Sequence, residues 1–151
     1  MAATLEVVGD PWTLLILRDA FAGVSRFEQW QENLGVARNV LAARLKALVS
    51  HGVLERRPYS EHPPRFEYVL TAKGRDLSPV LLTLAAWGDR HVYGGQGGPT
   101  QYTHVACGNR FSARLICDAC GEPIGPGSLV RARGPAKATV AQAMAEADGR
   151  D

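Results

Sequence analysis

The most specific spacing of chemically active residues lies in the last third of the chain. His104 and Cys107 are separated by two residues, Cys117 and Cys120 likewise, and a glycine follows each pair. A two-residue spacer lets both side chains of a tight turn point at one ion, and the glycine relieves the backbone where amides turn towards a thiolate. The repeated pattern predicts one structural Zn²⁺ ion bound by all four residues on a small ribbon.

Other interpretations of these four residues stay open. Cys107 could be a buried thiol, Cys117 and Cys120 could form a reversible dithiol, and His104 could be an ordinary surface histidine. Three clustered cysteines do not suggest a disulfide framework, because the count is odd. A zinc ion with four protein ligands leaves no position for water, so hydrolytic chemistry is disfavoured.

A second group of residues suited to binding chemistry is basic. The net charge of the chain is only +2, but residues 36–65 alone carry six lysines and arginines against two glutamates, which gives +4. The basic residues of this window are Arg38, Arg44, Lys46, Arg56, Arg57 and Arg65. Such a concentration of positive charge suits the binding of a polyanion, although an ordinary solvated helix face would show a similar charge pattern.

Three short helices are predicted to precede and include the first basic residues. The first covers about 11–21 with Asp10 as its N-cap, and the second runs from Arg26 or Phe27 to Leu34 and stops at Gly35. The third begins near Ala37 and ends before Gly52. Short helices with tight joints predict a compact three-helix core.

A β-hairpin and a longer helix are predicted to follow. The strands are Val53–Arg57 and Phe66–Leu70, and the loop 58–64 looks too long for a two-residue turn, with prolines that would prevent pairing at its tip. Thr71 could cap a helix that reaches Trp87 or His91, with a kink at Pro79.

The order helix, helix, helix, hairpin, helix indicates DNA binding. The exposed face of the third helix would offer Arg38, Asn39, Ala42 and Ala43 to base edges, while Arg44 or Lys46 could meet phosphate. The hairpin would bring phosphate or minor-groove contacts from Arg56, Arg57, His62 and Arg65. Taken alone, the helix fits an ordinary surface helix better, and each hairpin arginine fits a solvated strand-end charge as well as a DNA contact.

Several short signatures carry a family resemblance across about Leu5–His91. They are Gly9–Arg18, Arg26-Phe27, Asn39–Leu41, Arg44-Leu45, Leu54–Arg57, Pro63–Arg65, Glu67-Tyr68, Leu70-Thr71, Lys73-Gly74 and Trp87-Gly88. The chain closely resembles the HxlR family of winged helix-turn-helix regulators, which is related to the MarR group. The resemblance implies a homodimer joined by terminal helices on a two-fold-related operator, with the recognition helix at Asn39–Lys46 and the wing at Arg56–Arg65.

One departure limits what this resemblance implies. Several redox-sensing members of the family carry a cysteine before the first core helix, whereas the cysteines here are Cys107, Cys117 and Cys120. Oxidant sensing by that N-terminal route is therefore not carried over to this chain.

An apolar stripe suggests how two copies would associate. It consists of Leu77, Val80, Leu81, Leu84 and Trp87. Together with Leu5, Val7, Val8 and Tyr93, this surface exceeds what a domain of about 90 residues should leave exposed. The alternative is that the helix packs on its own domain.

The chain is predicted to be organised around a glycine-rich linker. We expect a DNA-binding and dimerisation domain at 1–93, the linker at 94–99, the Cys/His segment at 100–133 and a mobile tail at 134–151. The composition, with 46% hydrophobic and 21% charged residues, is that of a globular protein. No apolar stretch is long enough to cross a bilayer, so a cytoplasmic location is expected.

The expected fold is α+β. It is a winged helix-turn-helix with a three-helix core, a hairpin wing, terminal dimerisation helices and a zinc-ribbon-like segment. The expected function is sequence-specific transcriptional regulation on double-stranded DNA, with a small-molecule effector as a further partner. A protein-interaction module, or a thiol- or metal-responsive redox protein, is the alternative. An enzyme has little support, because no catalytic grouping or phosphate loop stands out.

Overall fold

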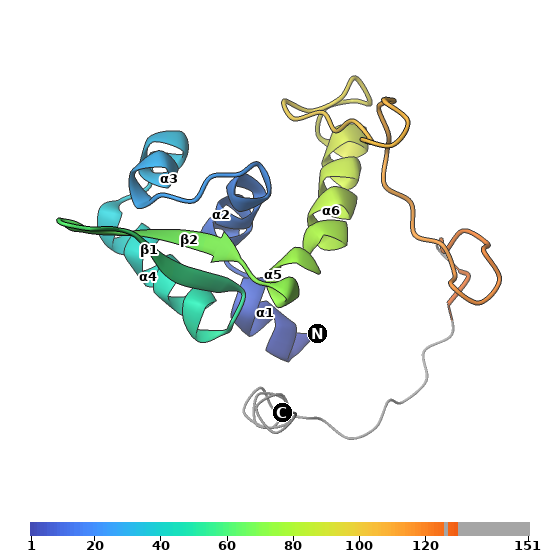
Figure 1. Cartoon of the computed structure of the whole chain (residues 1–151). Helices are drawn as coiled ribbons and strands as arrows, with labels where there is room; N and C mark the ends of the chain where they lie inside the picture. The colour runs from blue at the N-terminus through green and yellow to red at the C-terminus, as the bar shows by residue number, and fades with distance from the viewer. Residues whose placement is uncertain (126, 130–151) are drawn as a thin grey trace. The chain divides into compact units, whose positions relative to one another are not determined.

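A computed structural model describes residues 1–125 and 127–129 (Figure 1). The predicted tail at 134–151 and residues 130–133 of the predicted segment lie outside the described residues. The chain divides into two units, one that comprises Thr4–Ala113 and a second that includes Met1–Ala3 and the described residues from Arg114 onwards. The domain limits expected from the glycine-rich linker stay a prediction.

The chain begins with helix α1 (Ala2–Val8), which the sequence does not predict. Seven residues are too few to display a helical period against a strongly apolar background. Val8 of this helix is buried in the core. The joint that follows is tight, since a Cβ on Gly9 would meet the carbonyl oxygen of Leu5.

Helix α2 (Pro11–Phe21) begins where the sequence predicts. Oδ1 of Asp10 accepts hydrogen bonds from the backbone N–H groups of Trp12 and Thr13, at 3.0 and 3.3 Å. Pro11 occupies the first turn, where its missing N–H is not needed. The predicted cap is confirmed.

Helices α3 (Phe27–Leu34) and α4 (Arg38–Ser50) complete the three-helix core. Gly35 ends α3 in the left-handed conformation, with φ of 59°, as its position predicts. Trp30 is fully buried, and its indole Nε1 donates to the carbonyl oxygen of Ile16 at 3.2 Å. This core is lined by the inward leucines of α4, which are Leu41, Leu45 and Leu48.

The hairpin is longer than expected and its turn is shorter. Strands β1 (Leu54–Glu61) and β2 (Pro64–Leu70) pair antiparallel out to Glu61 and Pro64, so only His62 and Pro63 form the turn. The prediction of a long unpaired loop was wrong. In a two-stranded sheet, half of the backbone N–H groups point away from the partner strand, so a proline at such a position costs no hydrogen bond of the ladder. A β-bulge between Pro58 and Ser60 accounts for the shift in register between the two strands.

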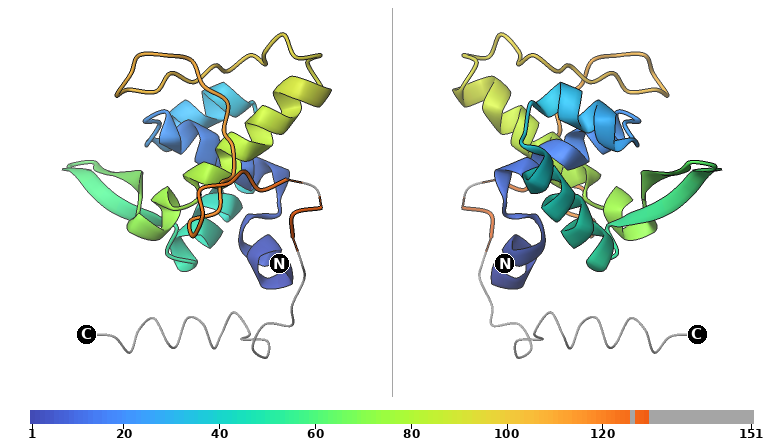
Figure 2. Two further views of the ribbon diagram at one scale, coloured as in Figure 1. Left: turned by 90° about the vertical axis from the view of Figure 1, so that its right-hand side faces the viewer. Right: turned by 90° about the vertical axis from the view of Figure 1, so that its left-hand side faces the viewer.

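The hairpin projects from the helical core as a wing, which is visible from both sides in Figure 2. It is tied to the core along β2, where the N–H of Tyr68 donates to the carbonyl oxygen of Ser25 at 2.8 Å. The ring of Tyr68 also packs edge-on against Trp30. The base of the wing is thus fixed to the core.

Two helices, not one kinked helix, follow the wing. Thr71 caps the short α5 (Ala72–Arg75) by accepting the N–H of Gly74 at 3.1 Å, and α6 (Ser78–His91) then starts separately. The predicted kink at Pro79 is therefore wrong. Pro79 lies in the first turn of α6, where proline is tolerated because no intrahelical partner is lost.

The predicted linker at 94–99 folds back on the end of α6. The N–H of Gly95 donates to the carbonyl oxygen of Asp89, and the N–H of Gly98 donates to its carboxylate at 2.7 Å. Across the part of the chain that the structure describes, no helix is long and apolar enough to span a membrane.

Candidate nucleic-acid interface

One face of α4 is open to solvent and carries the residues predicted to read DNA. The five residues of this helix that are predicted to contact base edges or, for Lys46, phosphate are all exposed: Arg38, Asn39, Ala42, Ala43 and Lys46. The leucines on the opposite face hold the helix on the core, so the open face combines small side chains with hydrogen-bonding ones. This composition permits a close approach to base edges in a major groove.

Arg44 lies in a different setting from its neighbours on α4. Its guanidinium forms an ion pair with Oδ2 of Asp10 at 2.8 Å, while the other oxygen of Asp10 caps α2. Arg44 is therefore engaged in holding α4 against the start of α2. Its predicted contact with phosphate stays a prediction.

The two adjacent arginines of β1 point to opposite faces of the wing. Arg56 pairs with Tyr68 across the ladder, and its guanidinium stacks on the ring of Phe66 at 3.4 Å from the centroid. Arg57 forms an ion pair with Glu55 at 2.9 Å. Because side chains alternate along a strand, only Arg56 shares the face of Tyr68 and Phe66.

The Arg57–Glu55 pair shifts the pKa of both groups in the direction expected for an ion pair. The hydrogen bond from Arg57 lowers the pKa of Glu55 below its ordinary value, and the same bond raises the pKa of Arg57. Glu55 is therefore ionised at neutral pH and partly neutralises Arg57. Arg56 carries its positive charge without such a partner among the described residues.

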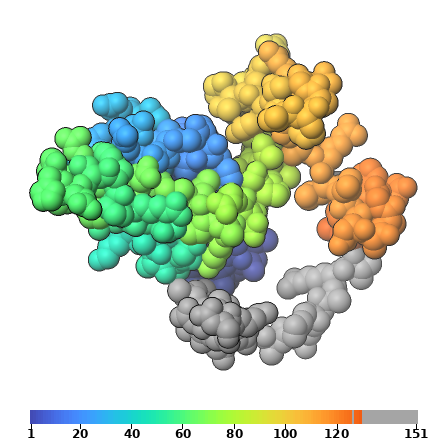
Figure 3. All heavy atoms as spheres, in the orientation of Figure 1, coloured from blue at the N-terminus to red at the C-terminus, as the bar shows by residue number. Residues whose placement is uncertain are grey.

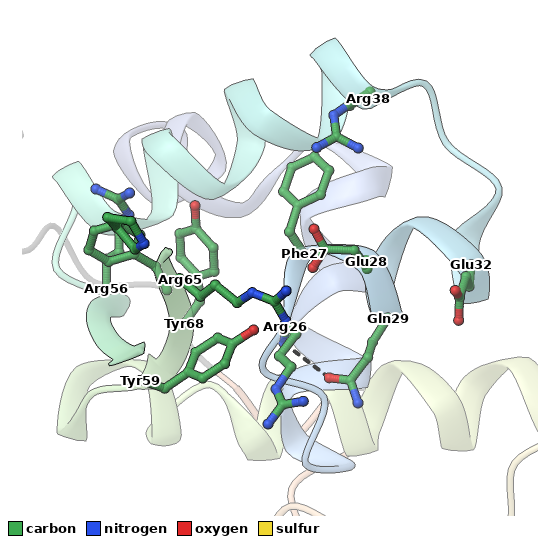
Figure 4. Close-up of a pocket in the computed structure, with 12 residues that line it drawn as sticks. Arg26, Phe27, Glu28, Gln29, Glu32, Arg38, Arg56, Tyr59, Arg65 and Tyr68 are labelled. Carbon is green, nitrogen blue, oxygen red and sulfur yellow. Dashed lines mark hydrogen bonds between the residues drawn. The ribbon is translucent and has the colours of Figure 1, made fainter. Parts of the chain in front are cut away.

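A cleft of about 670 Å³ separates the start of α3 and the start of α4 from the wing (Figure 4). Its charged lining consists of Arg26, Arg38, Arg56, Arg65, Glu28 and Glu32. Four arginines against two glutamates make the cleft positive. In the space-filling view of Figure 3, the green wing and the blue first helices form one continuous surface.

Aromatic rings hold three of the four arginines in place. Besides Arg56 on Phe66, Arg38 lies over Phe27 at 4.8 Å and Arg26 over Tyr59 at 4.6 Å, each measured to the ring centroid. Such stacking orients a guanidinium without neutralising its charge. Arg38 also donates to Oε1 of Gln31 at 3.3 Å.

Arg26 and Tyr59 are parts of this cleft that the sequence does not predict as contact residues. Arg26 precedes α3 outside the basic window, and Tyr59 occupies the bulge in a stretch predicted to be a loop. Two further predicted wing residues, His62 in the turn and Arg65 as the second residue of β2, are exposed near the tip.

The five residues predicted for dimerisation lie in two different environments. Leu77 and Leu81 pack against the core of their own domain. Val80, Leu84 and Trp87 are about half exposed, at 49%, 50% and 53%. These three line an apolar groove of about 420 Å³ together with Leu5, Val8, Gly9, Leu14 and Thr83.

The predicted metal ligands form two separate turns. In the first turn the Sγ of Cys107 lies 3.4 Å from Nδ1 of His104. In the second, the backbone N–H groups of Ala119 and then Cys120 lower the pKa of the Cys117 thiol. Among residues 1–125 and 127–129 there is no group of three or more His, Cys, Asp or Glu side chains that could hold an ion.

The trihelical core, the paired wing and the exposed face of α4 define a winged helix-turn-helix protein. The sequence model of the HxlR-like helix-turn-helix family matches residues 7–95, which is more than half of the chain. The protein belongs to that family. The resemblance inferred from the sequence is confirmed.

Similar proteins are named as regulators of transcription. The uncharacterised HTH-type transcriptional regulator Rv3095 of Mycobacterium tuberculosis (strain ATCC 25618 / H37Rv) is 47% identical over 131 residues, which are 87% of this chain and 83% of the relative. A stretch of 131 residues in a chain of 151 must include residues 104–120, so the match extends beyond the winged helix. The chain is thus a transcriptional regulator of the helix-turn-helix type, and such regulators are not enzymes.

Solved structures agree with this assignment. The crystal structure of PA1607, a candidate transcription factor, has a TM-score of 0.76 and 36% identity, covering 86% of this chain and 91% of that one. The reduced form of the redox regulator HypR has a TM-score of 0.55 and 30% identity, covering 61% of this chain and 94% of that one.

Proposed function

We propose that this protein binds DNA in a sequence-specific manner as a homodimer on a two-fold-related operator. The observation that carries the proposal is the exposed face of α4 beside a cleft with four arginines. Arg38 and Asn39 can each make two hydrogen bonds to a purine edge, and the small Ala42 and Ala43 let the helix approach. Lys46 would contact phosphate from the same helix.

The wing would contact the DNA backbone next to the groove that α4 occupies. Arg26, Arg56 and Arg65 reach the cleft from the segment before α3 and from both strands. Because stacking on Tyr59 and Phe66 leaves the charges of Arg26 and Arg56 available, phosphates can be their ionic partners. His62 at the tip would reach the adjacent minor groove.

A second copy of the chain would cover the apolar groove between α1, α2 and α6. Val80, Leu84 and Trp87 follow each other on one face of α6, and Leu5 of α1 adds a further exposed apolar side chain. A two-fold contact through one helix face is self-complementary, so the same patch serves both copies. It would set the two α4 helices about one DNA turn apart, roughly 34 Å.

Salt-dependent DNA binding tests this function. We expect the affinity of the protein for DNA to fall linearly on a double-logarithmic plot against salt, with a slope set by the number of phosphates that the protein neutralises. In the variant Arg26→Ala/Arg56→Ala/Arg65→Ala, the slope should decrease by about 0.9 for each phosphate that is no longer neutralised. Arg90→Ala is the matched control, because Arg90 lies on α6 outside the cleft.

An unchanged slope in the triple variant would contradict the proposed interface. If the triple variant still binds DNA like the unaltered protein, the cleft serves another partner, and a winged-helix protein-interaction module becomes the better description. A decrease of equal size in Arg90→Ala would show that overall charge, and not the cleft, determines binding.

A further inference from the structure

Side chains of α3 and α4 meet across the turn that joins these two helices. Arg38 is the first residue of α4, and its Nη1 donates to Oε1 of Gln31, in the last turn of α3, at 3.3 Å. The guanidinium also lies over the ring of Phe27, at the start of α3, 4.8 Å from the centroid (Figure 4). Two residues of α3 therefore hold the side chain with which the exposed face of α4 begins.

These contacts orient Arg38 and leave its positive charge in place. The amide oxygen of Gln31 and the aromatic ring are both uncharged groups. In contrast, Arg18, Arg44 and Arg57 each form an ion pair with a carboxylate, at 2.7, 2.8 and 2.9 Å. A carboxylate offsets the charge of a guanidinium and can accept two of its N–H groups, whereas the amide oxygen accepts one here. Arg38 is thus oriented and still fully cationic.

The remaining donors of Arg38 suit a guanine. A guanidinium has five N–H groups, and the hydrogen bond to Gln31 uses one of them. Guanine presents two acceptors, O6 and N7, side by side in the major groove, and an arginine can donate to both. Adenine and cytosine present an amino donor there, and thymine presents one acceptor beside its methyl group. Because Arg38 is exposed, its remaining donors can reach such a base edge.

Orientation of Arg38 before DNA binds makes its contact with a base more selective. Immobilising one unrestrained, rotamer-rich side chain weakens binding by about two- to tenfold. The contacts with Gln31 and Phe27 restrict the side chain already in the unbound protein, so less freedom is lost on binding. They also limit the other geometries that Arg38 could adopt to contact a different base. Both effects favour the base that fits the fixed guanidinium.

We propose that Gln31 and Phe27 are positioning residues, which hold Arg38 so that it selects a guanine at one defined position of each operator half-site. The inference rests on the proposed function, because it requires that α4 enters the major groove of a two-fold-related operator. It adds the base that is recognised and the residues that support its recognition. Helix α3 thereby influences the choice of sequence without contacting a base itself.

Affinities for a set of DNA duplexes test the proposal. The duplexes carry the motif that the unaltered protein selects from random DNA, with each of the four bases at every half-site position, and fluorescence anisotropy measures binding. The unaltered protein should prefer guanine at one position by at least about fivefold. Gln31→Met removes the acceptor at similar side-chain length and helix propensity, and should lower this preference by about two- to tenfold. The preference at the position that Asn39 reads should not change.

Further variants identify the side chain through which Gln31 acts. Arg38→Ala should abolish the guanine preference, and adding Gln31→Met to it should have no further effect on base preference. Phe27→Leu keeps an apolar side chain without an aromatic face and should lower the preference as well. Glu32→Gln is the matched control, because Glu32 follows Gln31 and lines the cleft. Loss of its charge should strengthen binding to all duplexes alike. Thermal unfolding checks that each variant is folded.

An unchanged guanine preference in either Gln31→Met or Phe27→Leu would overturn the proposal. A preference for another base at the position that Arg38→Ala relaxes would overturn it too. Both results leave the proposed function intact, because the protein would still select a two-fold-related motif. Failure of the unaltered protein to select any such motif would instead contradict the proposed function, and this inference with it.

Discussion

Arg56 and Arg57 are neighbours in β1, yet the wing gives them different environments. Arg56 stacks on Phe66 at the edge of the positive cleft, whereas Arg57 is paired with Glu55 on the other face. From the sequence the two arginines look equivalent, because composition does not show which face of a strand meets the core. The register of the ladder decides this difference.

Alanine substitution should separate the two arginines. We expect Arg56→Ala to weaken DNA binding and to lower the salt slope by about 0.9, while Arg57→Ala should do less because Glu55 already offsets its charge. Glu55→Gln should strengthen binding and steepen the slope, since the pKa of Glu55 is lowered and its charge is present at neutral pH. Fluorescence anisotropy over a salt series measures all three variants. Equal decreases in affinity for Arg56→Ala and Arg57→Ala would contradict the assignment of faces.

Asp10 and Arg44 should matter to stability more than to DNA binding. Asp10→Ala removes both the cap of α2 and the ion pair, and should lower the free energy of unfolding by about 1–2 kcal/mol. Asp10→Asn keeps a capping oxygen and should cost less. Arg44→Ala should cost about 1 kcal/mol or less, because the pair is partly exposed. Urea unfolding measures these changes, and a drop in DNA affinity in Arg44→Ala as large as in Arg38→Ala would instead place Arg44 at the phosphate.

At the scale of the elements, sequence motifs correctly predicted those helix ends that depend only on residues close by in the chain. Asp10 and Gly35 marked helix ends correctly, because a capping carboxylate and a left-handed glycine act within one turn of the chain. The kink predicted at Pro79 and the unpaired loop predicted from Pro58 were wrong. The effect of a proline depends on whether its nitrogen lies in the first turn of a helix or on the outward edge of a strand. The cleft also escaped prediction, since Arg26 and Tyr59 meet only in the folded protein.

Gly74 provides a test of how the wing is joined to α5 and α4. It is buried, and a Cβ there would meet the carbonyl oxygen of Val53. Gly74→Ala should therefore lower the free energy of unfolding by about 1–3 kcal/mol. Gly88→Ala is the control, because a Cβ at that helical position meets open space and should stabilise α6 by up to about 1 kcal/mol. Thermal unfolding compares the two, and a neutral Gly74→Ala would mean that the joint has room for a side chain.

At the scale of the whole molecule, the apolar groove is central to the proposed dimer. Leu84→Arg places a charge among Val80, Trp87 and Leu5 and should shift the protein towards monomer in sedimentation velocity. The operator affinity should fall with it, because a monomer reads one half-site only. Leu129→Arg is the control, since Leu129 is an exposed leucine outside the groove. A Leu84→Arg variant that stays dimeric would require another interface.

The most direct test of operator reading is selection of bound sequences from random double-stranded DNA with the full chain. We expect enrichment of a two-fold-related motif with half-sites about 10–10.5 base pairs apart, bound by a dimer. Arg38→Ala and Asn39→Ala should relax the preference at defined positions in each half-site, while binding persists through the wing. Failure to enrich any motif, or a motif without two-fold symmetry, would contradict operator reading by paired α4 helices.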